Sequence, residues 1–301
     1  MISIFTTIQI FAWVATMWKG KVVMTTAMHY AVGSIAILIV GGLNGIVTGI
    51  IPLDWQAHNT YFVVSHIHYV LIGGNMFPVF AGLYYWFPKM TGRMLNELLG
   101  KVSFWIAFIG FNVAFFPMQI VGLAGMPRRV YTYPAGLGWG AMNMVETVGA
   151  FVLGIGILLT LLNAIISRKS GRLAGRDPWN ADTLEWATDS PPEPYAFVHI
   201  PTVVSRHPLW DDHDEEADPE DERVFDEGRL TLVSTWLDAE PYAVASMPKE
   251  TLVPLFACLT LFGFFLSLVF QLMWVVLGCW IATLLLAFFW LWPRPEAEEA
   301  A

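Results

Sequence analysis

Two histidines, His66 and His68, lie one residue apart within an apolar stretch that covers residues 61–88. Imidazole nitrogen is a good ligand for iron, copper and zinc. Inside a bilayer an uncompensated polar ring is costly, so each ring should face protein, water or a metal. For either histidine alone, packing against neighbouring side chains is the simpler interpretation, but the spacing of the two adds a geometric constraint.

On a regular helix, residues i and i+2 point about 200° apart, because each residue turns the chain by about 100°. His66 and His68 should therefore project to opposite sides and cannot share one metal ion. Given a helix about 10–12 Å wide and metal bonds of about 2 Å, two centres would be on the order of 15 Å apart. Few other nitrogen or carboxylate donors lie nearby, so a planar macrocycle such as haem fits better than two bare ions.

A second pair of chemically active residues, Arg128 and Arg129, lies in a short connection between two apolar stretches. Haem carries two propionates, and adjacent guanidinium groups are well suited to hold carboxylates through paired hydrogen bonds. The alternative interpretation is a pair of interfacial arginines that bind lipid headgroups.

The elements that must position these residues are membrane helices. The 301 residues are 56% hydrophobic and only 14% charged, with a mean hydropathy of +0.55, which excludes an ordinary soluble domain. A bilayer core of about 30 Å needs roughly 20 apolar residues at 1.5 Å each. Stretches of this length occur at 27–51, 61–88, 102–126, 139–166, 251–272 and 274–293. We expect an all-α fold, a polytopic transmembrane helix bundle of six full spans plus one truncated N-terminal span at residues 1–18, which lack a charged leader and a cleavage site.

Hydropathy also divides the chain along its length. We expect a core bundle (1–170), a polar acidic cytoplasmic segment (171–250), a two-helix C-terminal membrane extension (251–294) and a polar tail (295–301). Within the polar segment, residues 211–227 hold eleven Asp or Glu and one Arg, which explains the net charge of −9. A solvated spacer is the simpler interpretation of this run, and a docking site is the alternative.

Basic residues predict the orientation. They cluster in alternate connections, which should be cytoplasmic: Lys19 and Lys21; Lys89, Arg93 and Lys101; Arg168, Lys169, Arg172 and Arg176. Connections 52–60 and 127–138 then face outward. The two cysteines, Cys258 and Cys279, lie in apolar runs and exclude a disulfide-stapled fold or a multi-cysteine metal cluster. Nucleic acid is excluded as a partner because there is no basic stripe.

Several motifs resemble the carboxy-terminal half of subunit I of haem–copper terminal oxidases of the cytochrome c oxidase type. They are HNTYFVVSHIHYV at 58–70, YWFPKMTGRMLNE at 85–97, LGKVSFW at 99–105 and GMPRRVYTYP at 125–134. The resemblance covers nearly all of residues 1–170. Residues 177–197 resemble the tail that follows the last core helix in bacterial members, and the last two spans resemble the extension of the longer bacterial forms.

The resemblance implies a role for each matched residue. His66 would be the axial ligand of the high-spin haem, where oxygen is reduced, and is therefore the implied catalytic residue. His68 would be an axial ligand of the low-spin haem. Arg128 and Arg129 match the pair that holds the haem propionates, and Asp54 matches a carboxyl group near the propionates of the high-spin haem.

The matched positions also include departures from the family pattern. His58 matches a ligand of a magnesium site, but Asn59 stands where the family has Asp, and the lost charge weakens binding of a hard cation. Gln9 stands where many members have a lysine of a proton channel, and glutamine cannot carry a titrating proton. Glu146, the lone acid of its span, is either a functional acid such as a proton-exit group or an interfacial glutamate.

The resemblance implies part of the catalytic subunit of a respiratory oxidase in the bacterial inner (plasma) membrane. Such an oxidase reduces dioxygen to water with electrons from cytochrome c or quinol and couples this to proton translocation. The copper-binding histidines belong to the other half of the family's subunit I, and these 301 residues contain no His-His pair, so copper requires that missing amino-terminal half. The expected partners are this half, subunits II and III, the electron donor and membrane lipid.

Two other interpretations remain. Met1 falls inside what the family makes a single helix, so the chain would be a truncated or split fragment without activity on its own, which needs a separate chain carrying the copper ligands. A polytopic ion transporter with histidines as proton carriers is the third interpretation, and it leaves the arginine pair unexplained.

Overall fold

The computed structural model describes residues 2–193, 197, 203, 205–210, 230–238, 240–246 and 251–292. Contacts within the chain divide it into two compact units. The first comprises Met1–Pro192 with His207–Asp211, and the second comprises Glu193–Arg206 with Asp212–Ala301. All the candidate ligands lie in the first unit.

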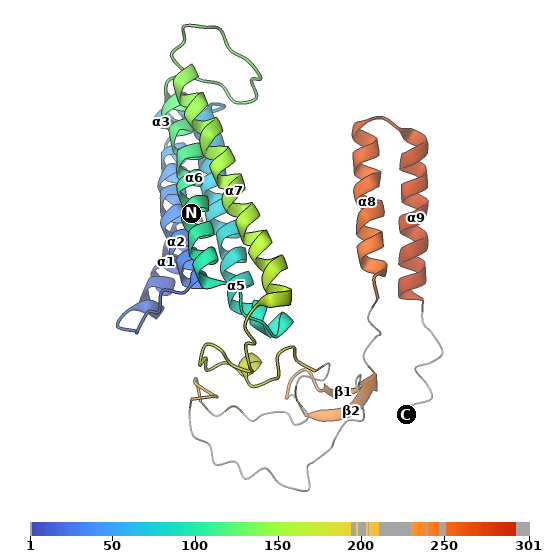
Figure 1. The fold of residues 1–301 in the computed structure, drawn as a ribbon. Helices are drawn as coiled ribbons and strands as arrows, with labels where there is room; N and C mark the ends of the chain where they lie inside the picture. The colour runs from blue at the N-terminus through green and yellow to red at the C-terminus, as the bar shows by residue number, and fades with distance from the viewer. Residues whose placement is uncertain are drawn as a thin grey trace. The chain divides into compact units, whose positions relative to one another are not determined.

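The first unit is a bundle of long helices (Figure 1). Its helices are α1 (Ile2–Met17), α2 (Thr26–Gly49), α3 (Ile51–Ala57), α4 (Tyr61–Leu71), α5 (Phe77–Thr91), α6 (Glu97–Leu123) and α7 (Gly140–Ser170), with a 3-10 turn at Leu184–Trp186. A π-helical turn at Ile72–Met76 joins α4 to α5. We refer to residues 50–60 and 124–139 as the α3 end of the bundle and to residues 92–96 and 171–192 as the α5 end.

Five helical segments of the described chain are long and apolar enough to cross a membrane. They are Thr26–Gly49, Tyr61–Thr91, Glu97–Leu123, Gly140–Ser170 and Met273–Leu291. Two further apolar helices are shorter, Ile4–Met17 and α8 (Val253–Val269). The membrane helix bundle is thus confirmed in outline, whereas the count of six full spans is not, because the helix within the apolar stretch 251–272 has only 17 residues.

Local sequence sets where the helices begin and end. Thr25, Thr60 and Asn96 precede α2, α4 and α6, and each side-chain oxygen accepts a hydrogen bond from a backbone N–H of the first turn. Such caps satisfy donors that have no partner within the helix. Helix α5 ends at Gly92, whose φ of +71° suits glycine because it has no Cβ.

A buried polar network joins four helices. Tyr30 of α2 hydrogen-bonds to Thr160 of α7 at 3.0 Å, and Thr160 donates to Ser103 of α6 at 3.2 Å. Asn163 of α7 donates to Tyr84 of α5 at 3.1 Å. All five residues are at most 2% exposed, so a helix that slides would leave buried polar groups without partners. The network therefore fixes the register of the four helices.

The described part of the second unit contains a β-hairpin and a helix pair. Strand β1 (Leu230–Ser234) pairs antiparallel with β2 (Pro241–Ser246), and α8 packs against α9 (Met273–Leu291). The hairpin corrects the expectation of an all-α fold. Its strands, LTLVS and PYAVAS, contain Thr, Val and Tyr, which favour extended backbone.

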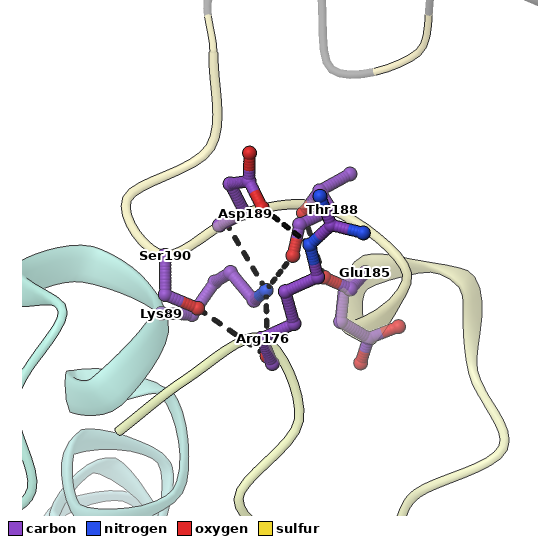
Figure 2. A network of polar contacts seen from close by, with 6 residues as sticks. All are labelled: Lys89, Arg176, Glu185, Thr188, Asp189 and Ser190. Atoms are coloured by element: carbon purple, nitrogen blue, oxygen red, sulfur yellow. Dashed lines mark hydrogen bonds and ion pairs between the residues drawn. The ribbon is translucent and has the colours of Figure 1, made fainter. Parts of the chain in front are cut away.

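Residues 176–190 pack against helix α5 through Lys89 (Figure 2). The Lys89 side chain is only 7% exposed. Its Nζ donates hydrogen bonds to three backbone carbonyls, those of Thr188 at 2.7 Å, Arg176 at 3.1 Å and Asp189 at 3.3 Å. It also lies 5.1 Å from the ring centroid of Trp186, so acceptors and an aromatic face compensate the buried ammonium.

We expect Lys89→Met to release residues 176–190 from the bundle, because three carbonyls lose their donor. The expected loss is about 2–3 kcal/mol of unfolding free energy. Trypsin should also cleave faster after Arg176. The control is Lys169→Met, which removes an exposed lysine near the same end. Equal melting temperatures and cleavage rates in the two variants would contradict the role given to Lys89.

Candidate functional site

Helix α4 carries both candidate haem ligands on a regular turn. It is α-helical from Tyr61 to Leu71, and the π-helical turn begins only at Ile72, beyond His68. As the spacing predicts, the rings meet different neighbours. His66 contacts α2, and His68 stacks on Phe115 of α6 with ring centroids 4.3 Å apart.

Each imidazole is held by a backbone carbonyl. The Nδ1 of His66 lies 3.0 Å from the carbonyl oxygen of Gly41, and the Nδ1 of His68 lies 2.7 Å from that of Val64. A carbonyl can only accept, so Nδ1 must carry the proton in both rings. With Nδ1 engaged in this way, Nε2 is the ring nitrogen that remains to bind a metal.

The His66 ring packs closely against Gly45 of α2. A Cβ added at Gly45 of α2 would lie 3.0 Å from Cε1 and 3.6 Å from Nε2 of His66. The neighbouring Asn44 has a buried amide nitrogen without a hydrogen-bond partner. The donor chemistry thus fits a haem iron at His66, and Gly45 is the residue that lets the ring lie this close to α2.

The contacts between α4 and α6 position His68. Ser65 donates to the carbonyl of Phe115 at 2.7 Å, and Tyr69 donates to Asn112 at 2.9 Å. These two side chains are one turn apart and fix the face of α4 that meets α6. The sequence motifs gave no indication of Phe115, because it is one of many aromatic residues in an apolar helix.

Two backbone hydrogen bonds join the loops at the α3 end. The N–H of Tyr61 donates to Met126 at 3.0 Å, and the N–H of Arg128 donates to Asn59 at 2.9 Å. Asn59 and Arg129 have φ values of +59° and +68°, which non-glycine residues adopt only where their surroundings hold them. The pairing therefore brings the HNT motif and the arginine pair together.

The remaining predicted site residues lie at this end too. Asp54 in α3 and His58 after it are 3.4 Å apart between Oδ2 and Nδ1, and the His58 side chain is 64% exposed. The structure brings Asn59 next to the loop that carries Arg128 and Arg129 (residues 124–139), which we call the arginine loop. His66 lies further along the chain, within α4. Among the described residues no three His, Cys, Asp or Glu side chains cluster as metal ligands. By themselves, these donors do not fit a magnesium ion, which needs more oxygen ligands.

Glu146 and Gln9 differ sharply in burial. The Glu146 side chain is only 4% exposed, so its carboxyl group is buried against other parts of the bundle. Gln9 is exposed on α1 of this chain.

The comparison with protein families decides the identity of this helix bundle. The family described as cytochrome c and quinol oxidase polypeptide I matches residues 1–152, which include every predicted ligand. The chain belongs to this family. It is therefore a member of the haem–copper oxidase subunit I family, as the motifs indicate.

Three bacterial relatives illustrate the extent of the match to subunit I. Cytochrome c oxidase subunit 1 of Alkalihalophilus pseudofirmus is 41% identical over 262 residues, 87% of this chain and 39% of that protein. The Bacillus subtilis protein of the same name is 47% identical over 210 residues, 69% of this chain and 34% of the relative. Quinol oxidase subunit 1 of Bacillus subtilis is 48% identical over 208 residues, which are 68% of this chain and 32% of the relative. The chain thus spans less than two fifths of the length of these relatives.

We expect Gly122→Ala to disturb the α4–α6 contact at the α3 end. An added Cβ would lie 2.8 Å from the Cα of Phe62 and closer still to its backbone nitrogen. Overpacking against backbone should cost about 1–3 kcal/mol and lower the melting temperature. Gly154→Ala is the control, since a Cβ at Gly154 meets nothing within 4 Å. A melting temperature unchanged by Gly122→Ala would contradict this packing.

Proposed function

We propose that this chain forms the ligand-bearing, carboxy-terminal part of the catalytic subunit of a haem–copper respiratory oxidase. The observation that supports the proposal most directly is the pair of imidazoles on α4. Both carry the proton on Nδ1, and each faces a different neighbouring helix. A rigid helix with one ligand on each side is suited to hold two redox centres at a fixed separation.

His66 would hold the high-spin haem and His68 the low-spin haem. Bound haem would supply the electron transfer and the reduction of dioxygen to water. The contribution of this chain would be to orient each imidazole through its Nδ1 hydrogen bond and to exclude water from the apolar bundle. Copper would be bound by histidines of the amino-terminal half of the subunit.

Arg128 and Arg129 would hold haem propionates at the α3 end, with Asp54 nearby. The half-buried Arg128 side chain and the backbone pairing to Asn59 support this assignment, because a charged fork is most effective when it is held in place. His58 and Asn59 would be magnesium ligands only together with further ligands from another chain.

The chain would lie in the bacterial plasma membrane. In our proposal α8 also crosses the bilayer as a full span, and α1 is a truncated first span. The domain boundaries follow the hydropathy: core bundle 1–170, acidic segment 171–250, membrane extension 251–294 and tail 295–301. Its partners would be the amino-terminal half of subunit I, subunits II and III, and cytochrome c or quinol as electron donor. The short coverage of the relatives favours activity only in such an assembly.

We expect His66→Ala to remove the high-spin haem signal and to spare much of the low-spin signal, and His68→Ala to do the reverse. The measurement is the visible spectrum of the assembled, membrane-extracted oxidase, with and without carbon monoxide, which binds an iron with an open coordination position. Equal loss of both signals in two variants that still fold would contradict the assignment of one haem to each face.

A matched pair of glycine variants tests the space beside His66. Gly45→Val should displace the His66 ring and reduce the carbon monoxide signal, while the low-spin absorbance stays. Gly42→Val is the control, because a Cβ at Gly42 meets nothing within 4 Å. If both variants lose the same signal to the same extent, Gly45 has no special role at the high-spin site.

A further inference from the structure

Glu146 is a buried carboxyl group that the proposed haem sites do not use. It lies six residues into α7, and its Oε1 is buried without a hydrogen-bond partner. Among the described residues, none of the ion pairs involves it. An unpaired carboxylate in apolar surroundings is costly. The group is therefore stable only as a neutral acid or in contact with water.

A structural role at the helix start does not account for this position. A carboxylate stabilises a helix by accepting hydrogen bonds from the N–H groups of the first turn, which in α7 lie around Gly140–Asn143. Glu146 is beyond that turn, about 9 Å along the helix at 1.5 Å per residue. No cap and no ion pair explain the carboxyl group.

Glu146 lines a pocket with space for water. The pocket has a volume of about 460 Å³ and is lined by Tyr61 of α4, Met118 of α6, and Asn143, Glu146, Thr147, Ala150 and Phe151 of α7. Because a water molecule occupies about 30 Å³ in the liquid, several can enter. Of the described residues that line the pocket, Glu146 alone has a carboxyl group.

The pocket lies at the α3 end, beside the arginine loop. The N–H of Tyr61 and the amide nitrogen of Asn143 both bond to Met126, at 3.0 Å to the carbonyl oxygen and 3.3 Å to the sulfur. Met126 precedes Arg128 by two residues, so the wall of the pocket is continuous with the loop proposed to hold propionates.

Few titratable groups face the carboxyl. The titratable side chain of α4 near the carboxyl group is Tyr61. Tyr133, in the loop between α6 and α7, is close enough to Tyr61 to interact with it electrostatically. From α6 the lining residue is Met118, and from α7 Glu146 itself is the titrating group. A phenol group has no positively charged form, so neither tyrosine would stabilise the carboxylate by charge attraction.

We propose that Glu146 is a proton-binding site in a water-accessible pocket at the α3 end. Its carboxylate takes a proton from a hydronium ion, which leaves a neutral carboxylic acid and a water molecule, and the reverse step returns the proton to water. No electron moves in either step. With the orientation that the basic residues predict, the α3 end faces outward, so a role in proton release during turnover rests on the function proposed above, whereas the proton exchange does not.

Infrared spectroscopy of the assembled oxidase tests the exchange. In the parent protein a carbonyl stretch of a protonated carboxyl should be present and should shift on transfer to D₂O. Glu146→Gln should lose this band, because glutamine keeps the shape but cannot titrate, and Glu146→Asp should retain a band at a changed frequency. The control is Glu185→Gln, the same replacement at an exposed carboxyl near the α5 end.

The proposal is overturned if the Glu146→Gln spectrum equals that of the parent, or if no carboxyl band of the parent responds to D₂O. The second measurement needs no variant, so a Glu146→Gln protein that fails to fold leaves the proposal open to refutation. Absent haem absorbance in the parent would instead contradict the proposed function, and the carboxyl band can be read independently of it. Proton release from vesicles should slow in Glu146→Gln and recover in Glu146→Asp.

Discussion

An imidazole nitrogen that meets a carbonyl oxygen must carry the proton, because the carbonyl can only accept a hydrogen bond. Gly41 and Val64 impose this condition on His66 and His68. With the proton fixed at Nδ1, each ring presents its Nε2 lone pair without any change in tautomer. The metal binding that we propose therefore depends on two backbone carbonyls, one from a neighbouring helix and one from the same helix.

Because α4 is one rigid helix, it would hold the two proposed haem irons at a fixed separation. Its backbone is regular from Tyr61 to Leu71, so the two rings leave it toward α2 and α6. Ser65 and Tyr69 fix α4 against α6, and the loop pairing at Tyr61 fixes the start of the helix. A shift of any of these contacts would move both rings together, because they share one rigid element.

Sequence alone predicted the features that depend on local periodicity. The opposed histidines follow from the helical repeat, and the membrane spans follow from apolar length. The neighbours of each ring could not be predicted, because Gly45 and Phe115 lie on other helices and their pairing is a tertiary property. For the same reason, sequence did not indicate that Lys89 would bind carbonyls about 90–100 residues away.

Burial was the other property that sequence could not provide. The burial of Glu146 could not be predicted from its place near a helix start, because it depends on the packing of α7 against α6. The β-hairpin was not predicted because its two short strands lie within a segment that is polar and acidic as a whole. Periodicity predicts the direction in which a side chain leaves its helix, whereas composition does not predict which residues surround it.

The most direct test of the central claim is an anomalous difference map at the iron absorption edge from crystals of the assembled oxidase. We expect two iron peaks, one beside the Nε2 of His66 on the α2 side of α4 and one beside the Nε2 of His68 on the α6 side. A single peak, two peaks on the same side of α4, or a protein donor bound to either Nε2 would contradict it.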